Sequence, residues 1–143
     1  MTDLKLLALD SEDLDVISAT TQDAIVRVPD MGFARGDRRF ALLMNRYAWE
    51  QGAEGRNKGQ RKRAALHFER VTAAKVAGID TNARDGVLEL LDIRFAPGDA
   101  PAGVVELRFA GGGTIRLDVE CLEARLQDLG AAWSARARPE HAV

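Results

Sequence analysis

Five cationic side chains within eight residues form the most distinctive feature of the sequence, namely Arg56, Lys58, Arg61, Lys62 and Arg63. Such a cluster can neutralise several phosphates of a nucleic acid or of an anionic lipid surface. No aromatic residue lies between Gly52 and Arg63 to stack on a base, and long surface loops are often simply charged. We therefore predict anion or nucleic-acid binding by residues 56–63 as the alternative to a solvated loop.

His67 and Cys121 have the side chains best suited to acid–base or nucleophilic chemistry. The second imidazole, His141, lies in the final polar stretch, so no group has the spacing of metal ligands and no catalytic triad can be assembled. Acidic neighbours of Cys121 disfavour its thiolate. We expect His67 to face solvent or to contact a carbonyl, and Cys121 to be a small buried residue. The sequence predicts no catalytic residue, no metal ion and no cofactor.

Carboxylates and glycines give two further patterns. Glu89 with Asp92 and Glu106 with Asp118 are pairs that could divide acid and base roles, but nearby arginines predict cross-strand ion pairs on a solvated face instead. Residues 111–113 are three glycines that precede a strand pattern rather than a helix, which favours a hairpin turn over a phosphate-binding loop.

Short alternating apolar segments predict mostly strands. The expected strands are Lys5–Leu9, Ala24–Val28, Arg39–Trp49, Ala64–Ala77 with a bulge, Val87–Phe95, Val104–Phe109 and Thr114–Val119. The turn Arg35–Arg38 is expected to join the second and third of these in a hairpin. Because Phe40, Leu42 and Met44 share one face and the opposite face is also partly apolar, Arg39–Trp49 is expected to be central.

Two helices complete the expected elements. One begins after Asp10 or Ser11, whose side chains can cap it, and ends near Gln22. The other spans Glu120–Leu129, because Leu122, Leu126 and Leu129 share a helical face and Gly130 suits a C-terminal cap. The predicted fold class is α+β, a mainly antiparallel sheet or partly closed, pleckstrin-like barrel with one N-terminal-half helix and one C-terminal helix. Residues 1–133 are expected to form one domain and 134–143 a flexible tail.

Composition restricts the class of protein. The 143 residues are 46% hydrophobic and 29% charged, which is typical of a globular domain and not of a disordered chain. The net charge of −2 argues against a wholly basic nucleic-acid-binding surface. The longest apolar runs are too short to span a bilayer, the single cysteine excludes an internal disulfide, and no signal-peptide pattern is present. We expect a cytoplasmic location.

Three stretches carry a resemblance to a known family: Leu42–Glu50, Leu66–Val71 and Phe109–Leu117 with its continuation Glu120–Glu123. They resemble a bacterial family catalogued as domain of unknown function 2948, over about residues 4–133. The resemblance implies a bacterial cytosolic protein and brings no activity or catalytic residue with it.

Three functional hypotheses follow. The first is a non-enzymatic interaction module that binds a protein partner, because no catalytic constellation is present. The second is nucleic-acid or anionic-surface binding through residues 56–63, and the third is an enzyme whose site gathers His67, Asp92 or Arg94. Self-association through sheet edges and the pair Tyr47 and Trp49 stays open.

Overall fold

A computed structural model describes residues 3–47 and 61–130 of the chain. Its helical elements are α1 (Ser11–Thr20) and two short 3₁₀ turns, η1 (Val28–Asp30) and η2 (Arg35–Asp37). Its strands are β1 (Lys5–Ala8), β2 (Ile25–Arg27), β3 (Met31–Ala34), β4 (Arg39–Tyr47), β5 (Arg61–Phe68), β6 (Val71–Ala77), β7 (Val87–Pro97), β8 (Gly103–Phe109), β9 (Thr114–Val119) and β10 (Ala124–Asp128).

All described strand pairs are antiparallel, and the ten strands of the described residues form one open sheet in the order β1-β10-β5-β4-β2-β7-β8-β9-β6, with β3 also paired to β4. The predicted antiparallel sheet is thus confirmed. The sheet is not a closed barrel, because its path ends at β1 and β6 among the described strands.

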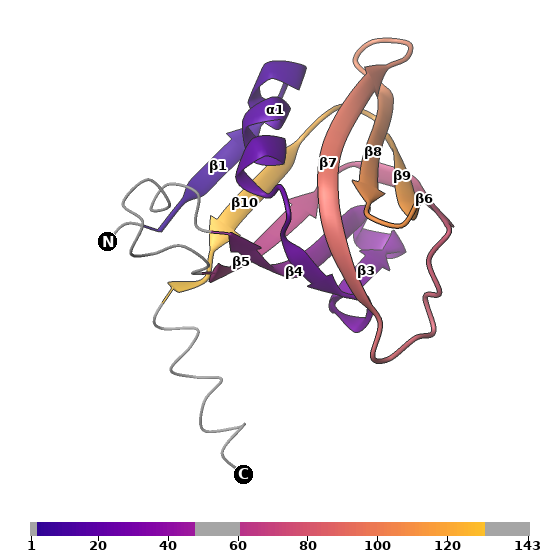
Figure 1. Ribbon diagram of the computed structural model, residues 1–143. Helices are drawn as coiled ribbons and strands as arrows, with labels where there is room; N and C mark the ends of the chain where they lie inside the picture. Colours follow the sequence, from indigo (N-terminus) through magenta and orange to yellow (C-terminus); the bar gives the residue numbers. More distant parts are fainter. Residues whose placement is uncertain (1–2, 48–60, 131–143) are drawn as a thin grey trace.

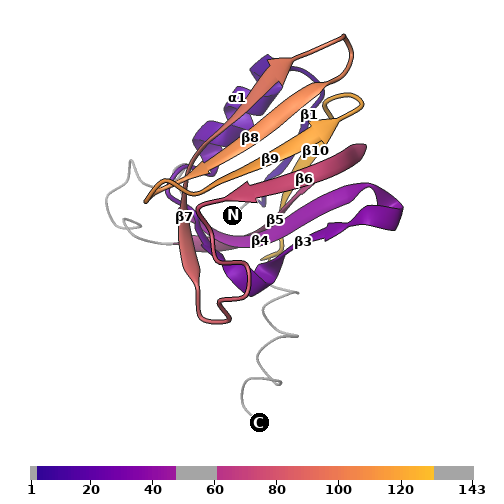
Figure 2. The ribbon, with the colours of Figure 1, turned by 90° about the vertical axis from the view of Figure 1, so that its right-hand side faces the viewer.

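The sheet folds over at β7 so that its two ends form facing layers. The first residues of β7 pair with β2, the rest pair with β8, and the register shifts between Leu90 and Asp92. A bulge of this kind bends a strand and increases its twist. Figure 2 shows β6, β8 and β9 in one layer and β3, β4 and β5 in the other. One strand therefore belongs to both layers.

A single apolar core lies between the layers. In β4, β5, β8, β9 and β10, buried residues alternate with less buried ones, so one side of each of these strands faces the core. The predicted inward row Phe40, Leu42 and Met44 is confirmed, with at most 4% of each residue exposed. Ile115 and Leu117 of β9 belong to the same core cluster. Full burial of side chains of this size contributes about 1.5–3 kcal/mol each.

The predicted N-terminal helix is confirmed as α1, which lies between β1 and β7 in Figure 1 and contacts both strands. The Asp10 side chain accepts a hydrogen bond from the Asp13 amide at 2.8 Å and so caps the first turn. Leu14 and Ile17 are buried on its inner face. Within the described residues, no helix is long and apolar enough to cross a membrane.

The predicted C-terminal helix over Glu120–Leu129 is wrong. Residues Ala124–Asp128 form strand β10, in which Ala124, Leu126 and Asp128 are buried and Arg125 and Gln127 are exposed. The spacing of the leucines fits a helix, but burial alternates from residue to residue as in a strand. The segment also pairs with β1 on one side and with β5 on the other, which makes it a strand. Gly130 has the left-handed φ of +60° that was expected, after a strand rather than after a helix.

Two strand boundaries also need correction. The segment Ala64–Ala77 is two strands, β5 and β6, separated at Glu69 and Arg70, whose φ is +60°. The change of face in the sequence reflects this break, and the bulge lies beyond it in the pairing of β6 with β9, between Val71 and Ala73. The turn Arg35–Arg38 joins β4 to the unpredicted strand β3, whereas β2 meets β4 at one residue pair.

Candidate functional site

The outer surface of β1, β10, β5, β4 and β3 carries side chains in rows across the strands. Directly paired residues in one row are Leu7, Arg125, His67, Ala41 and Gly32. A parallel row consists of Lys5, Gln127, Ala65 and Leu43. Paired residues on antiparallel strands point to the same face with Cβ atoms about 4.5–5.5 Å apart. We call this five-strand surface the outer face.

A charged cleft of about 480 Å³ opens on the outer face and contains both signs of charge. Its lining is Asp37, Arg38, Arg39, His67, Glu69, Arg70, Glu120, Glu123, Arg125 and Gln127. The cleft is formed where β5 and β10 meet the turns after η2 and before β6 and β10. The lining therefore comes from segments that are far apart in sequence.

Glu69 is the centre of hydrogen bonding in the charged cleft. Its Oε2 atom accepts from Arg39 Nε at 2.7 Å and lies 2.6 Å from His67 Nδ1. Burial alone would raise the pKa of Glu69, but the hydrogen bonds and charges of Arg39 and His67 together hold that pKa below its usual value. Glu69 is therefore ionised near neutral pH, so His67 Nδ1 is the protonated donor of this pair.

An apolar hollow of about 720 Å³ lies beside the charged cleft. Ala41, Leu43 and Ala65 are half-buried in it, and β3 and η1 supply Met31, Phe33 and Pro29. The hollow exists because two outward positions of β4 and β5 are alanines, whose side chains do not fill the space between longer neighbours. Arg63 and Asp30 stand close by, 3.5 Å apart.

The apolar hollow and the charged cleft meet at Arg39 and His67, which line both. The two together offer a ligand an apolar surface and, directly beside it, ionic partners. The residues lining the charged cleft include no Ser, Thr or Cys, and so no hydroxyl or thiol nucleophile for covalent catalysis. The arrangement suits binding of a ligand with apolar and charged groups.

The five predicted cations are only partly described. Arg56 and Lys58 lie outside the described residues, and Arg61, Lys62 and Arg63 form the start of β5. Arg61 donates to the carbonyls of Asp23 and Asn45 at 3.0 and 3.1 Å and stands over the Tyr47 ring. Arg63 pairs with Asp30. Anion binding by residues 56–63 stays a prediction.

The other predicted candidates lie apart from the outer face. Cys121 is half-buried before β10 and is not at a helix end. Asp92 binds Arg108 through two contacts of 2.8 and 2.6 Å, and Arg116 lies 3.2 Å from Glu106, which confirms the predicted cross-strand ion pairs. His67 lines the charged cleft and the apolar hollow, whereas Arg94 lines a different pocket with Phe95 and Arg116. No group of three metal-ligating side chains is found among residues 3–47 and 61–130.

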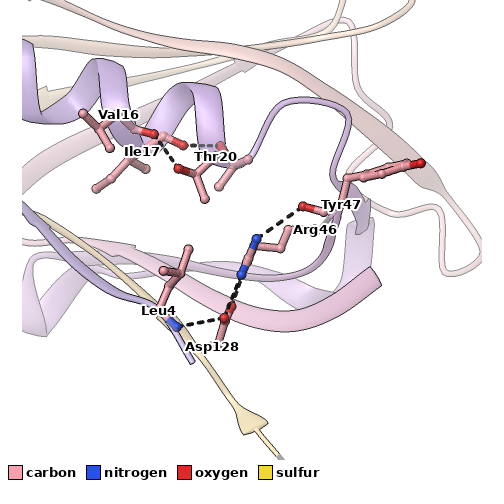
Figure 3. Close-up of polar contacts among 8 residues, drawn as sticks. Leu4, Val16, Ile17, Thr20, Arg46, Tyr47 and Asp128 are labelled. Atoms are coloured by element: carbon pink, nitrogen blue, oxygen red, sulfur yellow. Dashed lines mark hydrogen bonds and ion pairs between the residues drawn. The ribbon is translucent and has the colours of Figure 1, made fainter. Parts of the chain in front are cut away.

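An ion pair between Arg46 of β4 and Asp128 of β10 lies in the core (Figure 3). Their side chains are 0% and 1% exposed, and Nε and Nη2 of Arg46 each lie 2.8 Å from a carboxylate oxygen. Asp128 also accepts from the Leu4 amide at 2.9 Å. Burial would raise the pKa of Asp128, but these hydrogen bonds and the charges of Arg46 and Lys62 lower it. The closed surroundings of the pair indicate a structural role.

Sequence reasoning missed Arg125 and Glu69. Arg125 was placed on a helix, and Glu69 was hidden inside one long strand. The available signal was the spacing of His67 and Glu69, which are two residues apart. The chain breaks after β5, and this break lets the Glu69 side chain contact both His67 and Arg39.

Comparison with known proteins identifies one family model. The model described as "Protein of unknown function (DUF2948)" matches residues 4–141. This confirms the resemblance seen in the sequence. Neither the curated proteins nor the solved structures contain a match.

Proposed function

The chain belongs to the DUF2948 family, and on that premise we propose that it is a non-enzymatic binding module whose outer face docks an extended peptide segment of a protein partner. The observation that carries the proposal is the junction of the apolar hollow with the charged cleft at Arg39 and His67. Interfaces between proteins combine an apolar centre with a polar rim in this way.

The shape of the site favours a peptide over a small molecule. Pockets for small ligands bury about 70–90% of the ligand surface. The apolar hollow and the charged cleft are both open to solvent, so they suit a ligand that covers several strands at once. Leu7, which is 48% exposed at the far end of the same row, extends the apolar surface past Arg125.

Nucleic-acid binding through the basic segment is the weaker alternative. Arg61 and Arg63 hold protein carbonyls and Asp30, so contact with phosphate would compete with these interactions. That alternative predicts an affinity that falls steeply with salt concentration.

Selection from a random peptide library displayed on phage, with the full chain as bait, tests the proposal. The enriched peptides are then measured by fluorescence anisotropy against the wild type and against A41W/A65W, in which two indoles fill the apolar hollow. We expect affinity to fall about tenfold or more, equivalent to about 1.4 kcal/mol. The matched control is A77W, the same change at an exposed position of β6.

Three results would contradict the proposal. One is the absence of any enriched peptide, and another is equal binding by wild type and A41W/A65W when both have the circular dichroism spectrum of the folded protein. The third is a wild-type dimer in analytical ultracentrifugation that A41W/A65W converts to a monomer, because the outer face would then be covered by a second copy.

A further inference from the structure

Arg125 is the one arginine of the charged cleft whose side chain makes no hydrogen bond or ion pair with any described residue. Arg38 contacts Glu120 at 2.8 Å, Arg39 contacts Glu69 at 2.7 Å, and Arg70 lies 3.8 Å from Glu123. Arg125 is exposed on β10, directly opposite His67 on β5. Within residues 3–47 and 61–130, Arg125 is thus the one arginine of the charged cleft that has no ion pair.

We infer that Arg125 is the anchor for a carboxylate of the docked segment, so that the ligand is a peptide with an aspartate or glutamate beside apolar side chains. This inference rests on the proposed function and specifies its ligand. A guanidinium binds a carboxylate through two parallel hydrogen bonds, which gives direction as well as attraction. Leu7 supplies apolar surface on one side of that anchor, and on the other side the row passes through His67 to Ala41 in the apolar hollow.

The charge around Arg125 favours a carboxylate over a phosphate. Asp37, Glu69, Glu120 and Glu123 line the same cleft. Glu69, Glu120 and Glu123 pair with Arg39, Arg38 and Arg70, so the lining charges without an ion pair among the described residues are those of Arg125 and Asp37. Asp37 opposes a group of nearly two charges more strongly than a group of one, and one guanidinium balances one carboxylate.

His67 supplies a second donor to the same carboxylate when it is protonated. Its Nδ1 atom is held by Glu69, and its Nε2 atom has no partner among the described residues. A neutral imidazole with a proton on Nδ1 accepts at Nε2, whereas an imidazolium donates there. The charged and titratable groups that share the cleft with His67 are Asp37, Arg38, Arg39, Glu69, Arg70, Glu120, Glu123 and Arg125.

The test is a double-mutant cycle with peptides enriched on the wild-type chain. Each peptide is compared with its Glu→Gln or Asp→Asn form on the wild type and on R125Q. We expect loss of the peptide charge to weaken binding to the wild type about tenfold and binding to R125Q about twofold or less. R27Q is the matched control, because Arg27 is an exposed strand arginine outside the cleft and its removal changes the net charge equally.

The failures of the two proposals can be told apart. Enriched peptides that bind the apolar hollow but carry no acidic residue, or that lose equal affinity on R125Q and R27Q, would overturn the carboxylate anchor and leave the binding module standing. A phosphoserine peptide that binds more tightly than its glutamate counterpart would also overturn it. If no peptide is enriched, both proposals fall.

Discussion

Replacing Asp128 with asparagine would remove the carboxylate charge that the buried guanidinium of Arg46 contacts in the core. Both side chains are at most 1% exposed, and two contacts of 2.8 Å join them. Removing one partner of a buried ion pair costs about 3–5 kcal/mol, because the other charge stays in the apolar interior. The asparagine side-chain oxygen can still accept the hydrogen bond from the Leu4 amide. The decrease in the free energy of unfolding therefore reports on the removal of the charge.

An exposed pair of the same geometry provides the matched control. Asp92 and Arg108 also make two short contacts, of 2.8 and 2.6 Å, but their side chains are 26% and 39% exposed. Water can solvate the arginine that remains in D92N, so this change should cost about 1 kcal/mol or less. Asp92 also lies 3.3 Å from the exposed Arg94. The difference between D128N and D92N therefore compares a buried carboxylate with a more exposed one that makes the same two kinds of contact with an arginine.

Urea unfolding followed by circular dichroism is the assay. With a slope of about 2 kcal/mol per molar, D128N should lower the midpoint by about 1.5–2.5 M and D92N by about 0.5 M or less. If D128N does not fold, R46M/D128L replaces both charges by apolar groups and should recover most of the stability. Equal losses in D128N and D92N would refute the reasoning.

Two further predictions concern stability. The pKa of Asp128 is lower in the folded state than in the unfolded one, so its contribution to stability is complete above the unfolded pKa of about 4. The contribution is lost as pH falls from there through the lower folded pKa, and in this range the wild type should lose stability more steeply than D128N in acid titrations. A Cβ at Gly103 would lie 2.6 Å from the Ala96 carbonyl oxygen, whereas a Cβ at Gly32 would meet nothing within 4 Å. The G103A change should therefore lower the free energy of unfolding by about 1–3 kcal/mol, and G32A should change it little. Thermal unfolding of both variants checks this.

Local sequence patterns predicted most strands because burial alternates along them. Both boundaries of β9, Thr114–Val119, were predicted correctly, and those of β1, β7 and β8 were predicted to within a few residues. The helix predicted over Glu120–Leu129 is wrong because the spacing of Leu122, Leu126 and Leu129 fits a helix, and nothing in the local sequence marks Asp128 as buried. Its role depends on Arg46, which is 82 residues away. A periodicity argument cannot detect such a partner.

The candidate site was harder to predict than the fold. His67 was expected to face solvent or to contact a carbonyl, and it instead contacts the Glu69 carboxylate with its side chain 30% exposed. Its neighbour Arg125 comes from β10, so their pairing could not be seen while that segment was interpreted as a helix. The order of strands that are distant in sequence brings these residues together. The spacing of residues along one segment therefore does not predict the site.

The place of β10 between β1 and β5 has a consequence for synthesis on the ribosome. Among the described strands, β1 pairs with β10 alone, so the first strand to emerge has no sheet partner until the last one has been translated. Until then one edge of β5 lacks its neighbour, and Arg46 lacks Asp128. Elements completed from the N-terminus thus wait for residues 124–128, and the nascent chain presents an open strand edge of the kind that chaperones protect.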